Sequence, residues 1–171
     1  GRLYVKPLDL YLAGGDHLLN NYLYFGPDAE RRQEGEALNV LQLSVKKDLI
    51  VWRFHFYNRI GVQEIAGPDV LRLPRLISSH SLFFEGDLFR RNLRMRVGVD
   101  LRYHGGYFAD AFHQISQQFI LQNEAELPQF MALDLFASFK VKTFRFFIKM
   151  DNASSELFIE EPKSMTYRYP L

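Results

Sequence analysis

Cysteine is absent from this 171-residue chain, which excludes disulfides, thiolate metal sites and thiol chemistry. No run of about eighteen apolar residues occurs, so the sequence predicts no transmembrane helix, and its first residues do not form the basic-then-apolar pattern of a secretion signal. The net charge is only +1, whereas nucleic-acid-binding domains carry a marked basic excess. We therefore expect no nucleic-acid partner.

Aromatic and apolar residues, by contrast, are plentiful. The chain holds 16 Phe and 9 Tyr, and 47% of its residues are hydrophobic, which excludes a disordered or low-complexity protein. This bias suits strands, the aromatic girdles of membrane barrels and large soluble cores alike. Composition thus allows one domain with a sizeable apolar surface but does not say what that surface meets.

Residues 92–104 alternate between apolar and polar side chains over their whole length. The apolar positions are Leu93, Met95, Val97, Val99, Leu101 and Tyr103, and the polar set is Asn92, Arg94, Arg96, Gly98, Asp100, Arg102 and His104. Successive strand residues point to opposite sides of a sheet, so one side of this strand is apolar and the other wet. Ordinary strands run about 5 to 6 residues and a tilted membrane-spanning strand needs roughly 9 to 11, so the length favours a bilayer.

Short and long connections take turns along the chain. The strand candidates are residues 3–12, 18–25, 38–46, 49–65, 76–88, 92–104, 130–141 and 144–150. We expect the short connections at Gly14 and Gly15, at Lys47 and Asp48, at 89–91 and near Lys142, and the long ones at 26–36, 66–75, 105–128 and from Asp151 onward. Outer-membrane barrels have short periplasmic turns and long extracellular loops. The rhythm predicts an all-β, antiparallel, up-and-down transmembrane β-barrel, with about eight strands visible.

Several other segments repeat the two-faced pattern, and Pro7 makes the first candidate fit an edge or a terminus. We expect the lipid-facing set to comprise Trp52, Phe54, Phe56, Leu93, Met95, Val97, Val99, Leu101, Leu133, Leu135, Phe144, Phe146 and Ile148. The expected lumen-lining set is Arg53, His55, Arg59, Arg94, Arg96, Asp100, Arg102, Asp134, Lys140, Arg145 and Lys149. A soluble β-sandwich or lipocalin-like ligand carrier would alternate in the same way, but aromatic-rich strands of this length favour the membrane.

Four blocks of the sequence also resemble a known family. They are ALNVLQLSVKKDL, DVLRLPRLISSHSLFFEGDLFRRNLRMRVGVDLRYHGGYFADAF, QQFILQNE and LDLFASFKVKTFRFFIKMDN. Over roughly residues 18–171 they are similar, in order, to the C-terminal part of the putative porins of Bacteroidetes-type bacteria. The resemblance implies an outer-membrane β-barrel. Such barrels continue into a closing strand where this chain stops at Tyr169, Pro170 and Leu171, so we expect residues 1–171 to form a single barrel region at the C-terminal end of a longer chain.

Signatures of catalysis are weak, and we expect no enzymatic activity. Outer-membrane phospholipases use a Ser and a His on the outer surface of a barrel, and His80 lies near Ser78, Ser79 and Ser81, but such neighbours are common. The set His104, Asp110 and His113 lacks a regular ligand spacing, and a solvated loop explains it equally well. The glycines form no phosphate-binding loop. We expect no cofactor and no metal.

The expected function is passive diffusion of small hydrophilic solutes through a bacterial outer membrane. Basic side chains dominate the lumen set, and such a wall favours anions, unless its charges are merely solvated or paired across strands. A non-conducting barrel that anchors an envelope complex is the alternative, with residues 26–36, 105–128 and 151–164 as contact surfaces. Residues 105–122 could form a plug or could present Tyr107, Phe108 and Phe112 to a partner. The expected partners are outer-membrane lipid, solutes and envelope proteins.

Overall fold

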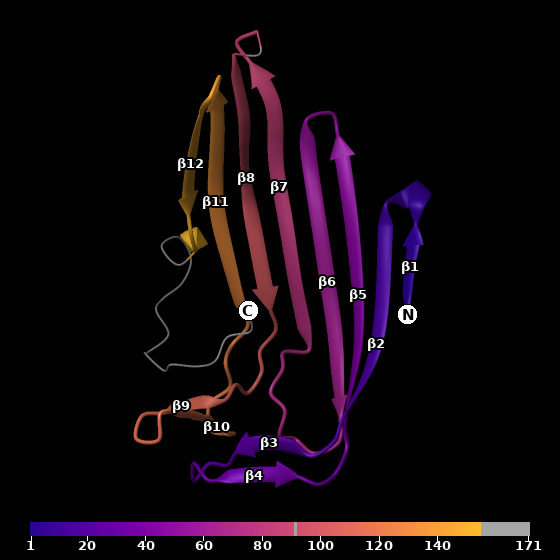
Figure 1. Ribbon diagram of the computed structural model, residues 1–171, viewed down its shortest axis with the longest axis vertical. Helices are drawn as coiled ribbons and strands as arrows, with labels where there is room; N and C mark the ends of the chain where they lie inside the picture. Colours follow the sequence, from indigo (N-terminus) through magenta and orange to yellow (C-terminus); the bar gives the residue numbers. More distant parts are fainter. Residues whose placement is uncertain (91, 155–171) are drawn as a thin grey trace.

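The fold is built around one antiparallel sheet of eight strands. The computed structural model describes residues 1–90 and 92–154. Within them lie β1 (Arg2–Val5), the 3-10 turn η1 (Lys6–Leu8), β2 (Leu10–Leu19), β3 (Tyr22–Phe25), β4 (Arg31–Glu34), β5 (Leu38–Val51), β6 (Phe54–Ala66), β7 (Leu76–Leu88), β8 (Leu93–His104), β9 (Ala111–His113), β10 (Gln118–Ile120), β11 (Phe130–Val141) and β12 (Phe144–Met150). The sheet order is β1-β2-β5-β6-β7-β8-β11-β12, with every neighbouring pair antiparallel (Figure 1).

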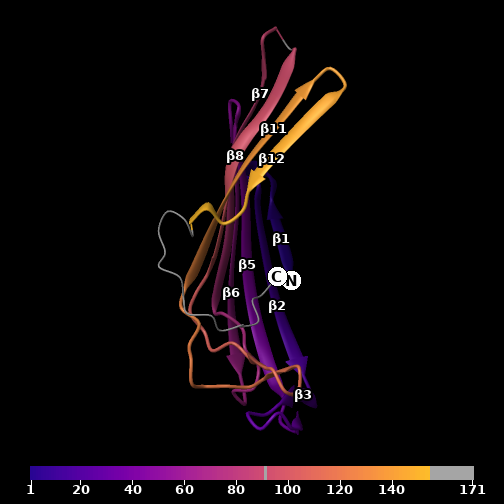
Figure 2. The same ribbon diagram turned by 90° about the vertical axis from the view of Figure 1, so that its left-hand side faces the viewer.

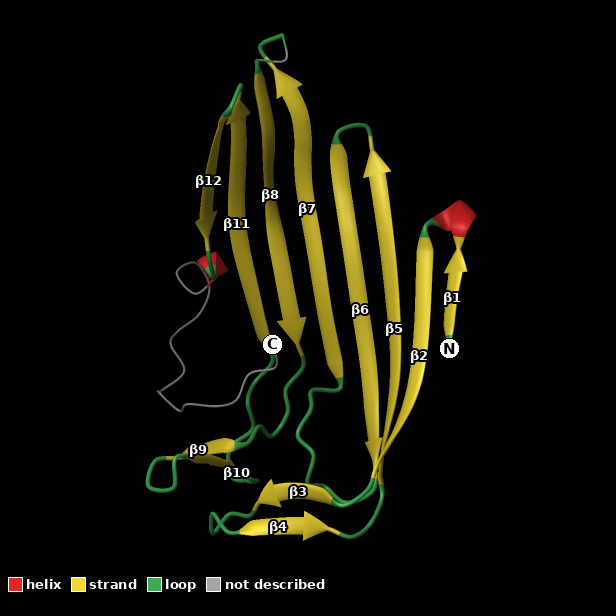
Figure 3. Cartoon of the chain, in the orientation of Figure 1, coloured by secondary structure: helices red, strands yellow, loops and turns green. Residues whose placement is uncertain are grey.

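The strands follow one another up and down, and the predicted rhythm of connections is confirmed. All short turns lie at one end of the sheet, and the long connections gather at the other end (Figures 1 and 3). Two of the long connections contain hairpins of their own, β3–β4 between β2 and β5 and β9–β10 between β8 and β11. Seen from the side, the long strands form a single twisted layer (Figure 2).

Six of the described strands are long enough to cross hydrocarbon. Strands β2, β5, β6, β7, β8 and β11 have 10, 14, 13, 13, 12 and 12 residues, against the roughly 9 to 11 that a tilted spanning strand requires. The predicted strands 76–88, 130–141 and 144–150 have the bounds expected, and 92–104 begins one residue later. Period-2 alternation located these strands well because each separates two different environments.

The predicted turn at Gly14 and Gly15 is wrong. Gly14 and Gly15 lie inside β2, where they pair with Leu43 and Gln42, and the chain instead reverses at η1, which contains Pro7. A glycine pair permits a turn without requiring one, whereas proline cannot donate to the ladder.

The predicted turn at Lys47 and Asp48 is also wrong. Both residues continue β5, because the ladder with β6 extends to the pair of Val51 and Phe54. The two-residue turn is Trp52 and Arg53, with Trp52 in the left-handed region at φ 56°. The charged pair suggested a turn, but the apolar residues after it prolong the strand.

Candidate functional site

The strand registers assign each residue of the sheet to one of two faces. Directly opposed residues of antiparallel strands point to the same side, so the assignment propagates from β8 across the whole sheet. We call the side that carries Arg96 and Asp100 the polar face, and the side that carries Val97 and Leu101 the apolar face. Asp100, for example, opposes Asp134 of β11, which therefore also belongs to the polar face.

Each predicted site residue has a definite place in this scheme. The register puts on the polar face His55, Arg59, Arg94, Arg96, Asp100, Arg102, Asp134, Lys140, Arg145 and Lys149. It puts on the apolar face Phe54, Phe56, Leu93, Met95, Val97, Val99, Leu101, Leu133, Leu135, Phe144, Phe146 and Ile148. Arg53 and Trp52 form the β5–β6 turn. The two sets are thus separated by the sheet.

Three acidic residues of the polar face were missed. Asp48 was assigned to a turn, and Glu85 and Asp87 of β7 were left out although residues 76–88 alternate as the other strands do. Glu85 opposes Arg96 and Asp87 opposes Arg94. The polar face therefore holds more carboxylates than the sequence analysis counted, although basic side chains still outnumber them.

Burial differs sharply between the faces. Every buried residue of the eight-stranded sheet lies on the polar face, namely Leu38, Val40, Gln63, Phe83, His104, Ala132 and Asp134. Most of the exposed large apolar side chains of these strands belong to the apolar face, including Leu43, Val62, Leu82 and Ile148. Side chains crowd together on the concave side of a curved sheet and spread apart on its convex side. The burial pattern is that of a sheet curved around its polar face.

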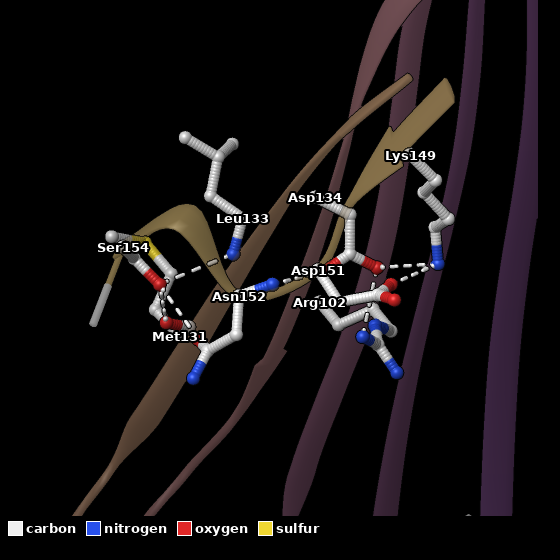
Figure 4. A network of polar contacts seen from close by, with 8 residues as sticks. All are labelled: Arg102, Met131, Leu133, Asp134, Lys149, Asp151, Asn152 and Ser154. Atoms are coloured by element: carbon white, nitrogen blue, oxygen red, sulfur yellow. Dashed lines mark hydrogen bonds and ion pairs between the residues drawn. The ribbon is translucent and has the colours of Figure 1, made fainter. Parts of the chain in front are cut away.

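Asp134 is the centre of a polar network on this face (Figure 4). Its carboxylate, with a side chain only 3% exposed, lies 2.9 Å from the guanidinium of Arg102 and 3.2 Å from Nζ of Lys149. It also accepts a hydrogen bond of 2.8 Å from the backbone N–H of Asn152. Lys149 contacts Asp151 as well. One carboxylate thus joins β8, β11, β12 and the segment that follows β12.

The same segment also satisfies the exposed edge of β11. Strand β12 stops at Met150, opposite Leu135, and within residues 1–90 and 92–154 no strand pairs with the preceding residues of β11 on that side. Ser154, which is 1% exposed, accepts a hydrogen bond of 3.3 Å from the N–H of Leu133 and donates one of 3.0 Å to the carbonyl of Met131 (Figure 4). Its hydroxyl replaces contacts that a longer β12 would have made.

An aromatic cluster centred on Phe83 occupies the middle of the polar face. The ring of Phe83 stacks on His55 with centroids 4.6 Å apart and meets Tyr57 edge-on at 5.2 Å. The guanidinium of Arg96 lies 3.8 Å from the centroid of the Phe83 ring. Phe83 opposes Gly98, which has no side chain to displace it. This arrangement holds Arg96 in place by a cation–π contact instead of an ion pair.

A groove of about 480 Å³ lies beside this cluster, at the end of the sheet with the short turns. It is lined by Arg53, His55, Glu85, Gly86, Asp87, Arg90 and Arg94. Arg94 forms an ion pair of 3.0 Å with Asp87 across the β7–β8 ladder. The groove is therefore lined by charges of both signs, part of which neutralise one another.

The long connections pack against one another at the opposite end. The N–H of Leu121 donates a hydrogen bond of 2.8 Å to the carbonyl of Phe25, which joins residues 105–128 to the β3–β4 hairpin. Tyr107 is 9% exposed and pairs with Leu127, so it is not presented outward, while Phe112 packs against Phe119 at 5.4 Å. These contacts fold residues 105–128 into a defined structure at the end of the sheet.

The weak catalytic and metal candidates find other partners. His80 lies on the apolar face, opposite to Ser79 and Ser81, and its Nδ1 is 2.8 Å from Oδ1 of Asn58. His113 contacts Ser116 at 2.9 Å, and His104 is enclosed between Tyr107 and Phe130. Among residues 1–90 and 92–154, no group of three or more His, Asp or Glu side chains is placed to hold a metal ion.

Comparison with known families agrees with this architecture. The model of the family described as "Putative porin" matches residues 1–171, the whole chain. The chain belongs to the putative porin family. No curated protein and no solved structure gives a significant match.

Membership of the putative porin family confirms the family to which the sequence blocks pointed. Porins are outer-membrane β-barrel proteins, and the all-β antiparallel sheet of this family member fits that class. Within the described part of the chain, no helix is long and apolar enough to cross a membrane. Tyr169, Pro170 and Leu171, where the sequence analysis expected the chain to stop before a closing strand, lie outside the described residues.

Proposed function

We propose that the polar face lines the water-filled lumen of an outer-membrane β-barrel and that small hydrophilic solutes diffuse through it. The observation that carries this proposal is the burial pattern, because crowding on the polar face is the pattern of a barrel interior. Charged and hydroxyl side chains on that face keep a lumen wet, as in other membrane barrels. Filtering is by lumen width and charge, without a cofactor.

The apolar face then meets lipid. Its exposed side chains include Leu43, Phe54, Val97, Leu135 and Phe146, which would be costly to leave in water over so large an area. In hydrocarbon the same side chains carry no such cost, and the backbone groups of the inner strands are already hydrogen-bonded in the ladders. We propose that residues 1–171 contribute one region of a barrel that further strands complete.

The lumen wall prefers anions in this proposal. Arg94 and Arg102 are paired with Asp87 and Asp134, whereas no carboxylate of the described residues forms an ion pair with Arg59, Arg96, Lys140 or Arg145. Pairing across strands, the alternative left open by the sequence, accounts for only part of the basic charge. The remaining cations give the wall a net positive potential, which lowers the barrier for anions.

The test is the reversal potential of the full-length protein in a planar bilayer under a salt gradient. Replacing Arg94, Arg96 and Arg102 by Gln removes three positive charges and leaves the negative charges of Asp87 and Asp134 in place, so the preference should move toward cations. The variant Arg59→Gln with Lys140→Gln breaks no ion pair, so it keeps the test valid if the first variant misfolds. Arg75→Gln is the control, because Arg75 pairs with Glu64 of the apolar face.

The outcomes separate the two parts of the proposal. Stable conductance steps whose selectivity shifts in the lumen variants but not in Arg75→Gln would support an anion-preferring pore. Conductance steps with unchanged selectivity would refute the role of the basic wall but would still support a conducting pore. Silence from a folded, heat-modifiable barrel would refute the pore and favour the anchoring function. Contact with envelope proteins through residues 26–36, 105–128 and 151–164 stays a prediction, and residues 155–164 lie outside the described part.

A further inference from the structure

A row of polar side chains crosses the middle of the apolar face. Lys47 of β5 opposes Asn58 of β6, and Asn58 opposes His80 of β7. On β6 the row lies between Phe56 and Ile60, so apolar side chains continue on both sides of it along the strand. If this face meets lipid, as proposed above, Asn58 and His80 lie within the hydrocarbon, and the Lys47 ammonium reaches toward the η1 turn.

Asn58 bonds to both neighbouring strands, to the backbone of Lys47 on one side and to the side chain of His80 on the other. Nδ2 of Asn58 donates to the carbonyl of Lys47 at 3.4 Å, and Oδ1 of Asn58 lies 2.8 Å from Nδ1 of His80. Since Oδ1 can only accept, Nδ1 carries the hydrogen, which leaves Nε2 as the acceptor in the tautomer that this bond selects. The ammonium of Lys47 donates to the carbonyl of Leu8 and retains further N–H donors. The row thus presents a donor at one end and an acceptor at the other.

Lipid cannot satisfy these groups. Hydrocarbon offers neither donors nor acceptors, and an ionisable side chain at such a depth costs about 2.5 to 3.5 kcal/mol on insertion scales. Polar groups inside a membrane therefore face a cavity or another protein surface. Since the row lies on the apolar face, away from the proposed lumen, a protein surface is the fitting partner.

The row is self-complementary under the symmetry that a membrane imposes. Two copies inserted in the same direction are related by a two-fold axis along the membrane normal. An axis in front of β6 places β5 of one copy opposite β7 of the other. Neighbouring strands are about 4.8 Å apart, so Lys47 and His80 flank Asn58 at nearly equal distances. Because spanning strands are tilted, Lys47 and His80 lie at different depths, and the long Lys47 side chain of each copy spans this offset to reach the His80 acceptor of the other.

We propose that the Lys47–Asn58–His80 row is the contact between two copies of this protein in the membrane. The inference rests on the proposed lipid-facing role of the apolar face, but it does not require that the pore conduct. Two reciprocal Lys47 to His80 hydrogen bonds, with Asn58 near the axis, engage the further N–H donors of Lys47 and the Nε2 atom of His80, which hydrocarbon cannot bind.

A cross-linking test is direct because residues 1–171 contain no cysteine, and any cysteine elsewhere in the full-length protein is first replaced by serine. Ile60→Cys introduces a single thiol on β6 beside the row, where the two copies should meet near the axis, and leaves the row intact. Met131→Cys is the matched control, because the register puts Met131 at the same level of the apolar face, on β11, and its exposure of 43% matches the 41% of Ile60. Full-length variants are oxidised in vesicles, after heat-modifiability has shown that each is folded.

We expect a disulfide-linked dimer for Ile60→Cys at a yield at least about fivefold above that of Met131→Cys. Adding Lys47→Leu and His80→Leu to Ile60→Cys should reduce the yield to the control level. Equal yields at the two positions, no dimer at either, or a dimer that persists without Lys47 and His80 would each overturn the proposal. A dimer that forms in a protein without conductance would instead refute the proposed pore and leave this contact standing.

Discussion

Gly98 offers the sharpest test of the packing on the polar face. A Cβ at this position would come within 2.4 Å of the carbonyl oxygen of Leu82 and within 2.4 Å of Cβ of Phe83. Both atoms belong to or adjoin the backbone of β7, so a flexible side chain cannot simply move aside. Gly98→Ala must therefore push β7 away from β8 or move Phe83 out of its stack with His55.

The expected loss follows from the size of this conflict. Inserting one methyl group into a well-packed region costs about 1 to 3 kcal/mol. Such a change lowers the ratio of folded to unfolded protein roughly 5- to 150-fold, since about 1.4 kcal/mol corresponds to a factor of ten. Displacing Phe83 would also disturb the cation–π contact of Arg96.

Equilibrium unfolding by urea in lipid vesicles measures this loss. Trp52 is the single tryptophan of residues 1–171, and its fluorescence reports unfolding without labelling once any tryptophan elsewhere in the full-length protein is replaced by phenylalanine. The matched control is Gly61→Ala, because Gly61 also lies on the polar face of a long strand and its added Cβ would meet only carbonyl oxygens at 3.9 and 4.0 Å. Equal free energies of unfolding for the two variants would refute the close approach of β7 to β8 at Gly98.

Three further predictions concern the network, the membrane boundary and the loops. Asp134→Asn should lower the free energy of unfolding by roughly 1 to 3 kcal/mol, because Arg102 and Lys149 lose their shared carboxylate. The same variant should strengthen the anion preference. Urea unfolding measures the first effect and reversal potentials the second, and an unchanged free energy of unfolding would contradict the role of the network. Trp52, 74% exposed beside Phe54, should shift its emission to shorter wavelength on insertion and be quenched by brominated lipid, whereas an unchanged spectrum would count against its place at the membrane. The N–H of Glu30, followed by Arg32, holds the pKa of Asp28 below its ordinary value, so this carboxylate stabilises its turn at neutral pH and loses that effect as the pH falls through the lowered pKa. Amide exchange at Glu30, corrected for its intrinsic rate, should accelerate over that range, and Asp28→Asn should remove the dependence.

The sequence alone determined the class of the fold and most of the long strands. Alternation of period 2 along a segment marks a strand between two unlike environments, and it located the long strands β7, β8 and β11 and the seven-residue β12 within one residue. Turns were less predictable at Gly14 and at Lys47, because turn-forming residues permit a reversal that the ladder can override. The division of residues into two sets also came from this alternation, since side-chain direction is a local property of a strand.

Only the tertiary structure decided which residues meet. Asp134 draws Arg102, Lys149 and Asn152 together from separate segments, and Phe83 covers Gly98 because the β7–β8 register places them opposite each other. The Lys47–Asn58–His80 row likewise exists only because two registers align three strands. A shift of one residue in any of these pairings would place each side chain on the other face. The local pattern thus determined which side chains each strand places on each face. The register, which depends on contacts distant in sequence, determined which side chains of neighbouring strands they meet.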